Sequence, residues 1–174
     1  MLERVEFRED QYGPEIASIL SLASGGARRM PLLRAECVSR DGLEAVRGLR
    51  ASDTVRAGLY LYLSCWDEAH STADAVENPD GYFWHAIVHR QEPDPTNAAY
   101  WFRKAGAHAV FPKLAGGAAE CGYGSGSSWD PFAFIEFCES ARRRPGSKEE
   151  QLAITVQHLE WQALFDHCAR GSAF

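Results

Sequence analysis

The sequence predicts an all-α protein with a single domain, in which antiparallel helix hairpins stack as a short solenoid or a bundle. Two observations carry this prediction. Apolar residues recur at intervals of three and four along most long segments, and prolines, glycines and capping residues divide these segments at helical lengths. A chain of 174 residues is about one domain, long enough to bury roughly two thirds of its unfolded surface.

The first half of the chain predicts helices in the ranges 14–23, 31–49 (one or two helices), 55–66 and 67–77. Pro14 suits the first helical position, because a proline there lacks only an N–H that has no partner in the helix. Ser52 or Asp53 supplies an N-cap for the third range. The stretch "NPDG" has the composition of a turn and closes the fourth range.

The second half predicts helices in the ranges 82–91, 95–105, 132–143 and 147–169. Asp94 and Asp130 each precede a proline, so each carboxylate caps a helix whose first residue needs no N–H partner. Ser147 and Glu150 form a capping box. The glycine- and serine-rich run 116–128 predicts a flexible loop, and it lacks the lysine of a phosphate-binding loop.

Composition and charge narrow the classes of partner. Hydrophobic residues make up 45% and charged residues 24% of the chain, as in ordinary globular proteins. Between Asp67 and Asp94, seven acids face one base, which matches the net charge of the whole chain, −6. A negative field repels phosphate backbones and attracts cations, so we expect no nucleic-acid partner.

The chain start and the cysteines bear on location. "MLERVEFRED" lacks the pattern of a secretory signal, and the apolar run 16–23 is too short to span a bilayer, so we expect a cytoplasmic protein without a membrane segment. The cysteines are odd in number and contain no C-x-x-C pair, which predicts buried thiols rather than a disulfide framework. They are Cys37, Cys65, Cys121, Cys138 and Cys168.

An internal repeat runs through residues 55–106. Aligning 67–78 with 96–107 superposes three apolar positions on one helical face, and the helices before each copy supply partners for two hairpins. The aligned pairs are Ala69 with Ala98, Ala73 with Phe102, and Val76 with Ala105.

The segment "NAAYWFRKAG" resembles the second helix of tetratricopeptide-type repeats, whose pattern includes A-x-x-x-F. The resemblance covers 55–106 and implies a scaffold that binds peptides or proteins on a concave face. The longer pattern "HAIVHRQEPDPTNAAYWFRKAGAH" also resembles a group of small bacterial and fungal proteins of uncharacterised activity, so it implies no reaction.

Two pairs of polar residues indicate either a candidate metal site or hydrogen-bonding side chains that line a helix interface. His85 and His89 are four residues apart on one helix, and His70 and Asp74 are four apart on the preceding one. An antiparallel pairing about the short turn sets His70 level with His89 and Asp74 level with His85. Imidazoles and a carboxylate suit zinc, nickel or iron, although Ala86 stands where H-E-x-x-H places its general base.

These residues support two functions. The first is a helical module that binds a protein, a peptide or a small cationic ligand in an acidic groove. Its predicted lining is Tyr82, His85, His89, Asn97, Tyr100 and Arg103. The second is a metal-binding protein, or a hydrolase in which the ion activates water. The sequence contains no nucleophile turn such as G-x-S-x-G, and it does not specify an oligomeric state.

Overall fold

The computed structural model describes residues 7–171, and every regular element in that range is helical. The all-α prediction is therefore confirmed. The α-helices are α1 (Pro14–Ser21), α2 (Arg40–Gly48), α3 (Asp53–Tyr62), α4 (Trp66–Asp74), α5 (Pro79–Gln91), α6 (Pro95–Ala105), α7 (Phe111–Glu120), α8 (Pro131–Ala141) and α9 (Lys148–Gly171). Two short 3-10 turns, η1 (Glu9–Tyr12) and η2 (Ser24–Gly26), flank α1. Across the described residues, no helix has both the length and the apolar character that crossing a membrane requires.

The predicted capping residues begin several of these helices. Ser52, Asp94 and Asp130 each accept a backbone N–H two or three residues further on, at the starts of α3, α6 and α8. Asn78 does the same at the start of α5. The "NPDG" stretch, predicted as a turn that separates two helices, is therefore the cap and first turn of α5.

Two segments differ from the predicted elements. In the range 31–49 only α2 is helical, because the residues before it bond to the ends of other helices: the Arg34 N–H donates to the Gln91 carbonyl. Helix α7 was not predicted; it continues to Glu120, so it shortens the loop predicted over 116–128, and it buries Leu114 and Ala118 on its inner face.

The prediction that all five cysteines are buried thiols is wrong for Cys37 and Cys65, which form a disulfide, and for Cys121, which is an exposed thiol. The Val38 N–H donates to the Leu63 carbonyl, and this bond lays the irregular segment beside the start of α4. The Cα atoms of the two cysteines are 4.3 Å apart although 28 residues separate them in the chain. Sequence spacing alone did not indicate this contact.

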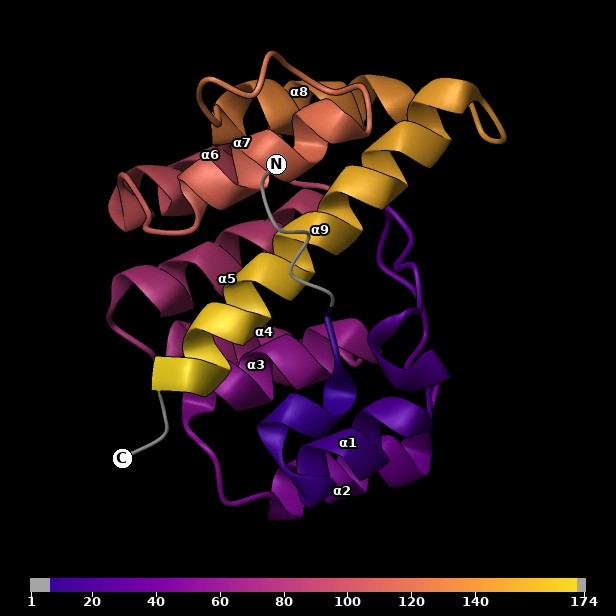
Figure 1. Ribbon diagram of the computed structural model, residues 1–174, viewed down its shortest axis with the longest axis vertical. Coiled ribbons are helices and arrows are strands. Elements are labelled where there is room, and N and C mark those ends of the chain that lie inside the picture. The colour runs from indigo at the N-terminus through magenta and orange to yellow at the C-terminus, as the bar shows by residue number, and fades with distance from the viewer. Residues whose placement is uncertain (1–6, 172–174) are drawn as a thin grey trace.

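The helices α3 to α6 pack successively, so residues 55–106 do contain the two expected hairpins, α3/α4 and α5/α6. Figure 1 shows α1 and α2 at one end of the molecule, α6 to α8 at the other, and α9 running diagonally across the face between them. One hydrophobic core lies mainly among α1 to α6 and the second half of α9, and a smaller one lies among α7, α8 and the first half of α9. Helix α9 therefore belongs to both cores.

The crossing of α3, α5 and α9 is tightly packed. The indole N–H of Trp161 on α9 donates to the Gly58 carbonyl on α3 at 2.8 Å. A Cβ atom at Gly58 would lie 2.8 Å from the ring of Trp84 on α5, so only glycine allows this approach. The three helices thus meet around two buried tryptophans.

A buried ion pair joins α5 to α9. The guanidinium of Arg90 donates to both carboxylate oxygens of Glu160, and neither side chain is more than 1% exposed. The side-chain amide oxygen of Gln157 lies 3.4 Å from the same guanidinium. The guanidinium carbon lies 4.7 Å from the centre of the Phe134 ring. Because water is excluded, each charge depends on the other.

We expect Glu160→Gln to destabilise the protein by about 3–5 kcal/mol, since it leaves a buried guanidinium without its counter-charge. Adding Arg90→Met in the same chain should recover most of that loss, because both buried charges are then gone. Urea unfolding followed by circular dichroism measures both changes. The matched control is Glu44→Gln, which breaks an exposed ion pair with Arg47 and should cost about 1 kcal/mol or less. An equal loss in Glu160→Gln and Glu44→Gln would contradict the argument.

Candidate metal centre

Three imidazole rings converge between α4 and α5. The ring centroid of His70 lies 4.8 Å from that of His85 and 5.0 Å from that of His89, and the latter two rings are 4.8 Å apart. One nitrogen from each ring lies within 4.8 Å of the other two. The four-residue spacing on α5 and the short connection from α4 produce this convergence.

Two tryptophans hold these rings in place. The His70 ring stacks on Trp66 at 5.1 Å between centroids, and the His85 ring stacks on Trp101 of α6 at 3.9 Å. Trp66 is itself anchored, because its indole N–H donates to the Val88 carbonyl at 3.0 Å. The imidazoles therefore lie in a rigid aromatic frame that three helices supply.

His85 is the most unusual member of the group. Its side chain is only 2% exposed, and neither ring nitrogen has a hydrogen-bond partner within residues 7–171. Burial, together with the neighbouring His89 and His70, lowers the pKa of His85 to about 4, so the ring is neutral at pH 7. Burial and His89 also lower the pKa of His70. Buried polar groups without partners are rare and carry a desolvation cost of about 1–3 kcal/mol each.

His89 is oriented by a carboxylate. Its Nδ1 lies 2.7 Å from a Glu92 oxygen, so Nδ1–H donates to Glu92. The amide nitrogen of Asn97 lies 3.3 Å from both ring nitrogens. The predicted cap at this turn is present, because Asp94 accepts from the Asn97 N–H at the start of α6.

Asp74 lies at the edge of the cluster. Its nearer oxygen is 3.7 Å from Nδ1 of His85, which agrees with the predicted register but exceeds hydrogen-bond distance. The side chain is 62% exposed, and the set of mutually close ligand atoms contains the three histidines without it. The structure thus brings together three of the four predicted ligands and leaves Asp74 beside them.

The six residues predicted to line a groove do not share one surface. His85 and His89 are buried, Asn97 and Tyr82 are partly buried beside them, and Tyr100 is 47% exposed. Arg103 lies elsewhere, in a hollow of about 330 Å³ between α6 and α8 that Phe132 and Glu136 also line. The reason is helical: Arg103 and Tyr100 occupy the side of α6 away from α5.

A second histidine cluster joins residues that the sequence did not connect. Nε2 of His108 and Nε2 of His167 lie 2.8 Å and 3.1 Å from the same oxygen of Asp80. The Val110 N–H donates to Nδ1 of His108, so Nε2 of that ring carries the proton and points it at Asp80. The His108 ring has both nitrogens satisfied, and the cluster serves as a tie among α5, the α6–α7 loop and α9.

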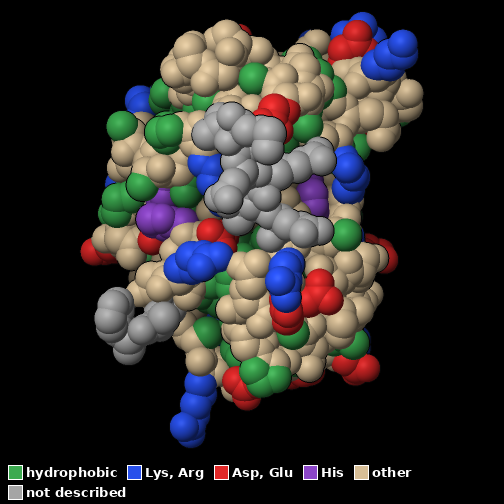
Figure 2. Space-filling view, viewed as in Figure 1, with side chains coloured by type: hydrophobic (Ala, Val, Ile, Leu, Met, Phe, Trp, Pro, Cys, Tyr) green, Lys and Arg blue, Asp and Glu red, His purple; other side chains and the backbone are tan. Residues whose placement is uncertain are grey.

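Charge does not gather into a basic surface on the face shown in Figure 2, where acidic and basic side chains are interspersed. Compared with known proteins, this chain matches no family model, no curated protein and no solved structure. The site must therefore be interpreted from its own geometry.

Proposed function

We propose that this protein binds a divalent transition-metal ion through His70, His85 and His89. The observation that carries the proposal is the state of His85: a buried ring with two nitrogens that lack partners, set between two other imidazoles. The second cluster offers an internal contrast, because His108 has a partner at each ring nitrogen. A metal ion accepts the lone pair of an imidazole nitrogen, and such an ion would be the missing partner of His85.

The surrounding residues suit such an ion. Zinc, nickel and iron(II) all accept neutral imidazole nitrogens, and the lowered pKa values of His70 and His85 keep these rings neutral. Glu92 accepts from Nδ1 of His89, the carboxylate–histidine arrangement that orients metal ligands and raises their basicity. The acidic stretch from Asp67 to Asp94 adds a field that attracts cations.

Three protein ligands leave a coordination position for water or for Asp74. An ion with three histidines and a bound water is the arrangement of catalytic zinc sites, in which the water becomes a nucleophile near neutral pH. If Asp74 turns inward instead, the ion has four protein ligands and serves stability alone. The partial exposure of His70 and the exposure of Asp74 favour an open position on the solvent side if an ion binds.

A second candidate function, a helical module for a protein or peptide partner, is favoured by the hollow between α6 and α8. Two exposed aromatic rings, Tyr100 and Phe132, lie on the helices that form it, and Arg103 and Glu136 supply opposite charges. The resemblance of residues 55–106 to tetratricopeptide-type repeats supports the same function.

Isothermal titration of chelator-treated protein with Zn²⁺ or Ni²⁺ tests the metal proposal, and we expect about one equivalent to bind per chain. Each of three single variants should abolish that binding, because the two imidazoles that remain bind the ion too weakly to replace its water ligands. These variants are His70→Gln, His85→Gln and His89→Gln. Circular dichroism of each variant verifies that it is folded.

His167→Ala is the matched control, because it removes a histidine from the other cluster. It should leave metal binding unchanged. Loss of binding in His167→Ala, or no binding by the native chain, would contradict the proposed centre.

Glu92→Gln should weaken metal affinity by about 10–100-fold without abolishing it, as expected for a carboxylate that orients a ligand without touching the ion. Glu77→Gln removes the same charge from the same acidic stretch at an exposed position, and it should change affinity little. Equal effects of the two variants, measured by competition with a metallochromic indicator, would show that only the general negative field matters.

The neutral state of His85 can be tested without metal. The unfolded chain takes up a proton near the ordinary pKa of 6.5, whereas folded His85 resists protonation down to about 4. Between these values the unfolded state binds more protons, so stability falls as pH is lowered, by on the order of 3 kcal/mol from this group.

Urea unfolding in chelator at pH 7 and pH 4.5 should show a smaller pH dependence in His85→Gln than in the native chain. His158→Gln provides a comparison, because burial also lowers the pKa of His158 to about 4. The two variants should each remove part of the dependence, and their effects should add. An unchanged pH dependence in His85→Gln would show that this ring is protonated or solvated in the folded protein.

A further inference from the structure

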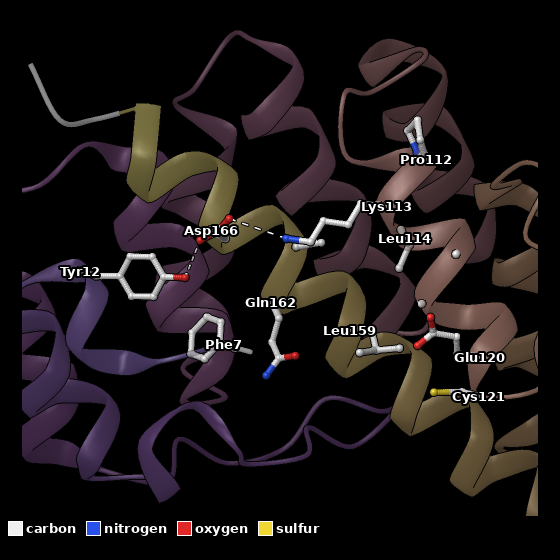
Figure 3. Close-up of a pocket in the computed structure, with 13 residues that line it drawn as sticks. Phe7, Tyr12, Pro112, Lys113, Leu114, Glu120, Cys121, Leu159, Gln162 and Asp166 are labelled. Carbon is white, nitrogen blue, oxygen red and sulfur yellow. Dashed lines mark hydrogen bonds and ion pairs between the residues drawn. The ribbon is translucent and has the colours of Figure 1, made fainter. Parts of the chain in front are cut away.

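A cavity of about 470 Å³ lies between α7 and α9 and is closed on one side by Phe7 and Tyr12 (Figure 3). Its walls are mostly apolar, with Leu114 from α7 and Leu159 and Ala163 from α9. This volume is within the range of sites that enclose small organic molecules. The cavity is separate from the histidine cluster, which lies between α4 and α5.

Two glycines of α7 open the cavity. Gly116 and Gly117 both line it, so that stretch of the helix presents backbone in place of side chains. A Cβ atom built at Gly117 would lie 3.7 Å from a methyl group of Leu159, an ordinary contact distance. Alanine therefore fits at this position, whereas a larger side chain would extend into the space beside Leu159.

One charged group in the lining is already compensated. Asp166 accepts a hydrogen bond from the Tyr12 hydroxyl at 2.8 Å and another from Arg170 at 2.8 Å. These bonds satisfy one oxygen of its carboxylate and balance its charge. The bond to Asp166 also uses the single proton of the Tyr12 hydroxyl, which then has none to donate to a ligand.

Among the described residues that line the cavity, Lys113 is the cation, and it forms a long ion pair with Asp166. The ammonium of Lys113 is 3.8 Å from the other oxygen of Asp166, beyond hydrogen-bond distance, and its side chain is half exposed. Figure 3 shows Lys113 reaching across from α7 towards α9. The amide of Gln162 also lines the cavity, one turn along α9 from Asp166.

We propose that this cavity binds a small monocarboxylic acid with an apolar body. The apolar part lies along Leu159, Ala163 and the glycines of α7, and the carboxylate accepts a hydrogen bond from the ammonium of Lys113. An ammonium–carboxylate contact at the mouth of an apolar site is charge-assisted and stronger than a neutral hydrogen bond. The opposite end, where Glu120 lies, repels the carboxylate and so sets the direction in which the acid enters.

Isothermal titration with octanoate, octanol and octylamine tests this proposal, because the three probes share a chain and differ only in the head group. We expect octanoate to bind at least about tenfold more tightly than octanol, the difference that one charge-assisted contact provides. Octylamine should bind more weakly than octanol. No octanoate binding, or octylamine binding as tightly as octanoate, would overturn the proposal.

Two pairs of variants locate the site. Lys113→Gln should remove the preference for octanoate over octanol and leave octanol binding intact, whereas Lys148→Gln, at the exposed start of α9, should alter neither. Gly117→Phe should block both probes and Gly117→Ala should block neither. An octanoate preference that survives in Lys113→Gln, or octanoate binding that survives in Gly117→Phe, would place the acid elsewhere on the protein.

Discussion

The burial of α5 beyond its first turn is the constraint on which the rest of the structure depends. Every residue from Phe83 to Gln91 is buried, so this helix has no solvent face in that stretch. Most surface helices place polar side chains in water, but a helix covered on all sides must satisfy its polar side chains within the protein. The side chains that pack against α5 must therefore include partners for its polar residues as well as for its apolar ones.

Three polar side chains of α5 show three solutions to this constraint. Arg90 is neutralised by Glu160 on α9, a pairing that joins α5 to the longest helix. His89 donates to Glu92, a residue just beyond the end of its own helix. His85 has neither solution and is neutral because burial lowers its pKa. The first two side chains explain how the helix tolerates its position, and the third marks the place where the protein alone does not complete the bonding.

The helical periodicity and the capping residues were sufficient to predict the fold class, the ends of most helices and the convergence of His70, His85 and His89. They were sufficient because the relevant distances are local: four residues along a helix, or one short connection between two helices. The burial of His85 and His89 was not predictable in the same way. On α5 they lie off the strongest apolar stripe, and rings from neighbouring helices cover them: Trp101 of α6 stacks on His85, and Trp66 and His70 of α4 lie against His89.

Contacts between distant segments account for the features that the sequence did not reveal. The disulfide of Cys37 and Cys65 depends on an irregular segment bonded to the end of α3, and no periodicity describes such a segment. The cluster around Asp80 joins residues from three separate elements. In each case the individual residues have ordinary types and spacings, and only the tertiary path of the chain brings them together.

Gly81 explains why local spacing was enough for the histidine cluster. This residue lies in the first turn of α5 against the end of α4, where a Cβ atom would be 2.4 Å from the Val76 carbonyl oxygen. A side chain there would force the connection apart and move α4 away from α5, and backbone cannot yield as a flexible side chain can. The close approach lets His70 reach both histidine rings of α5. The geometry of the candidate centre therefore depends on Gly81, which lies eleven residues after His70 and four before His85.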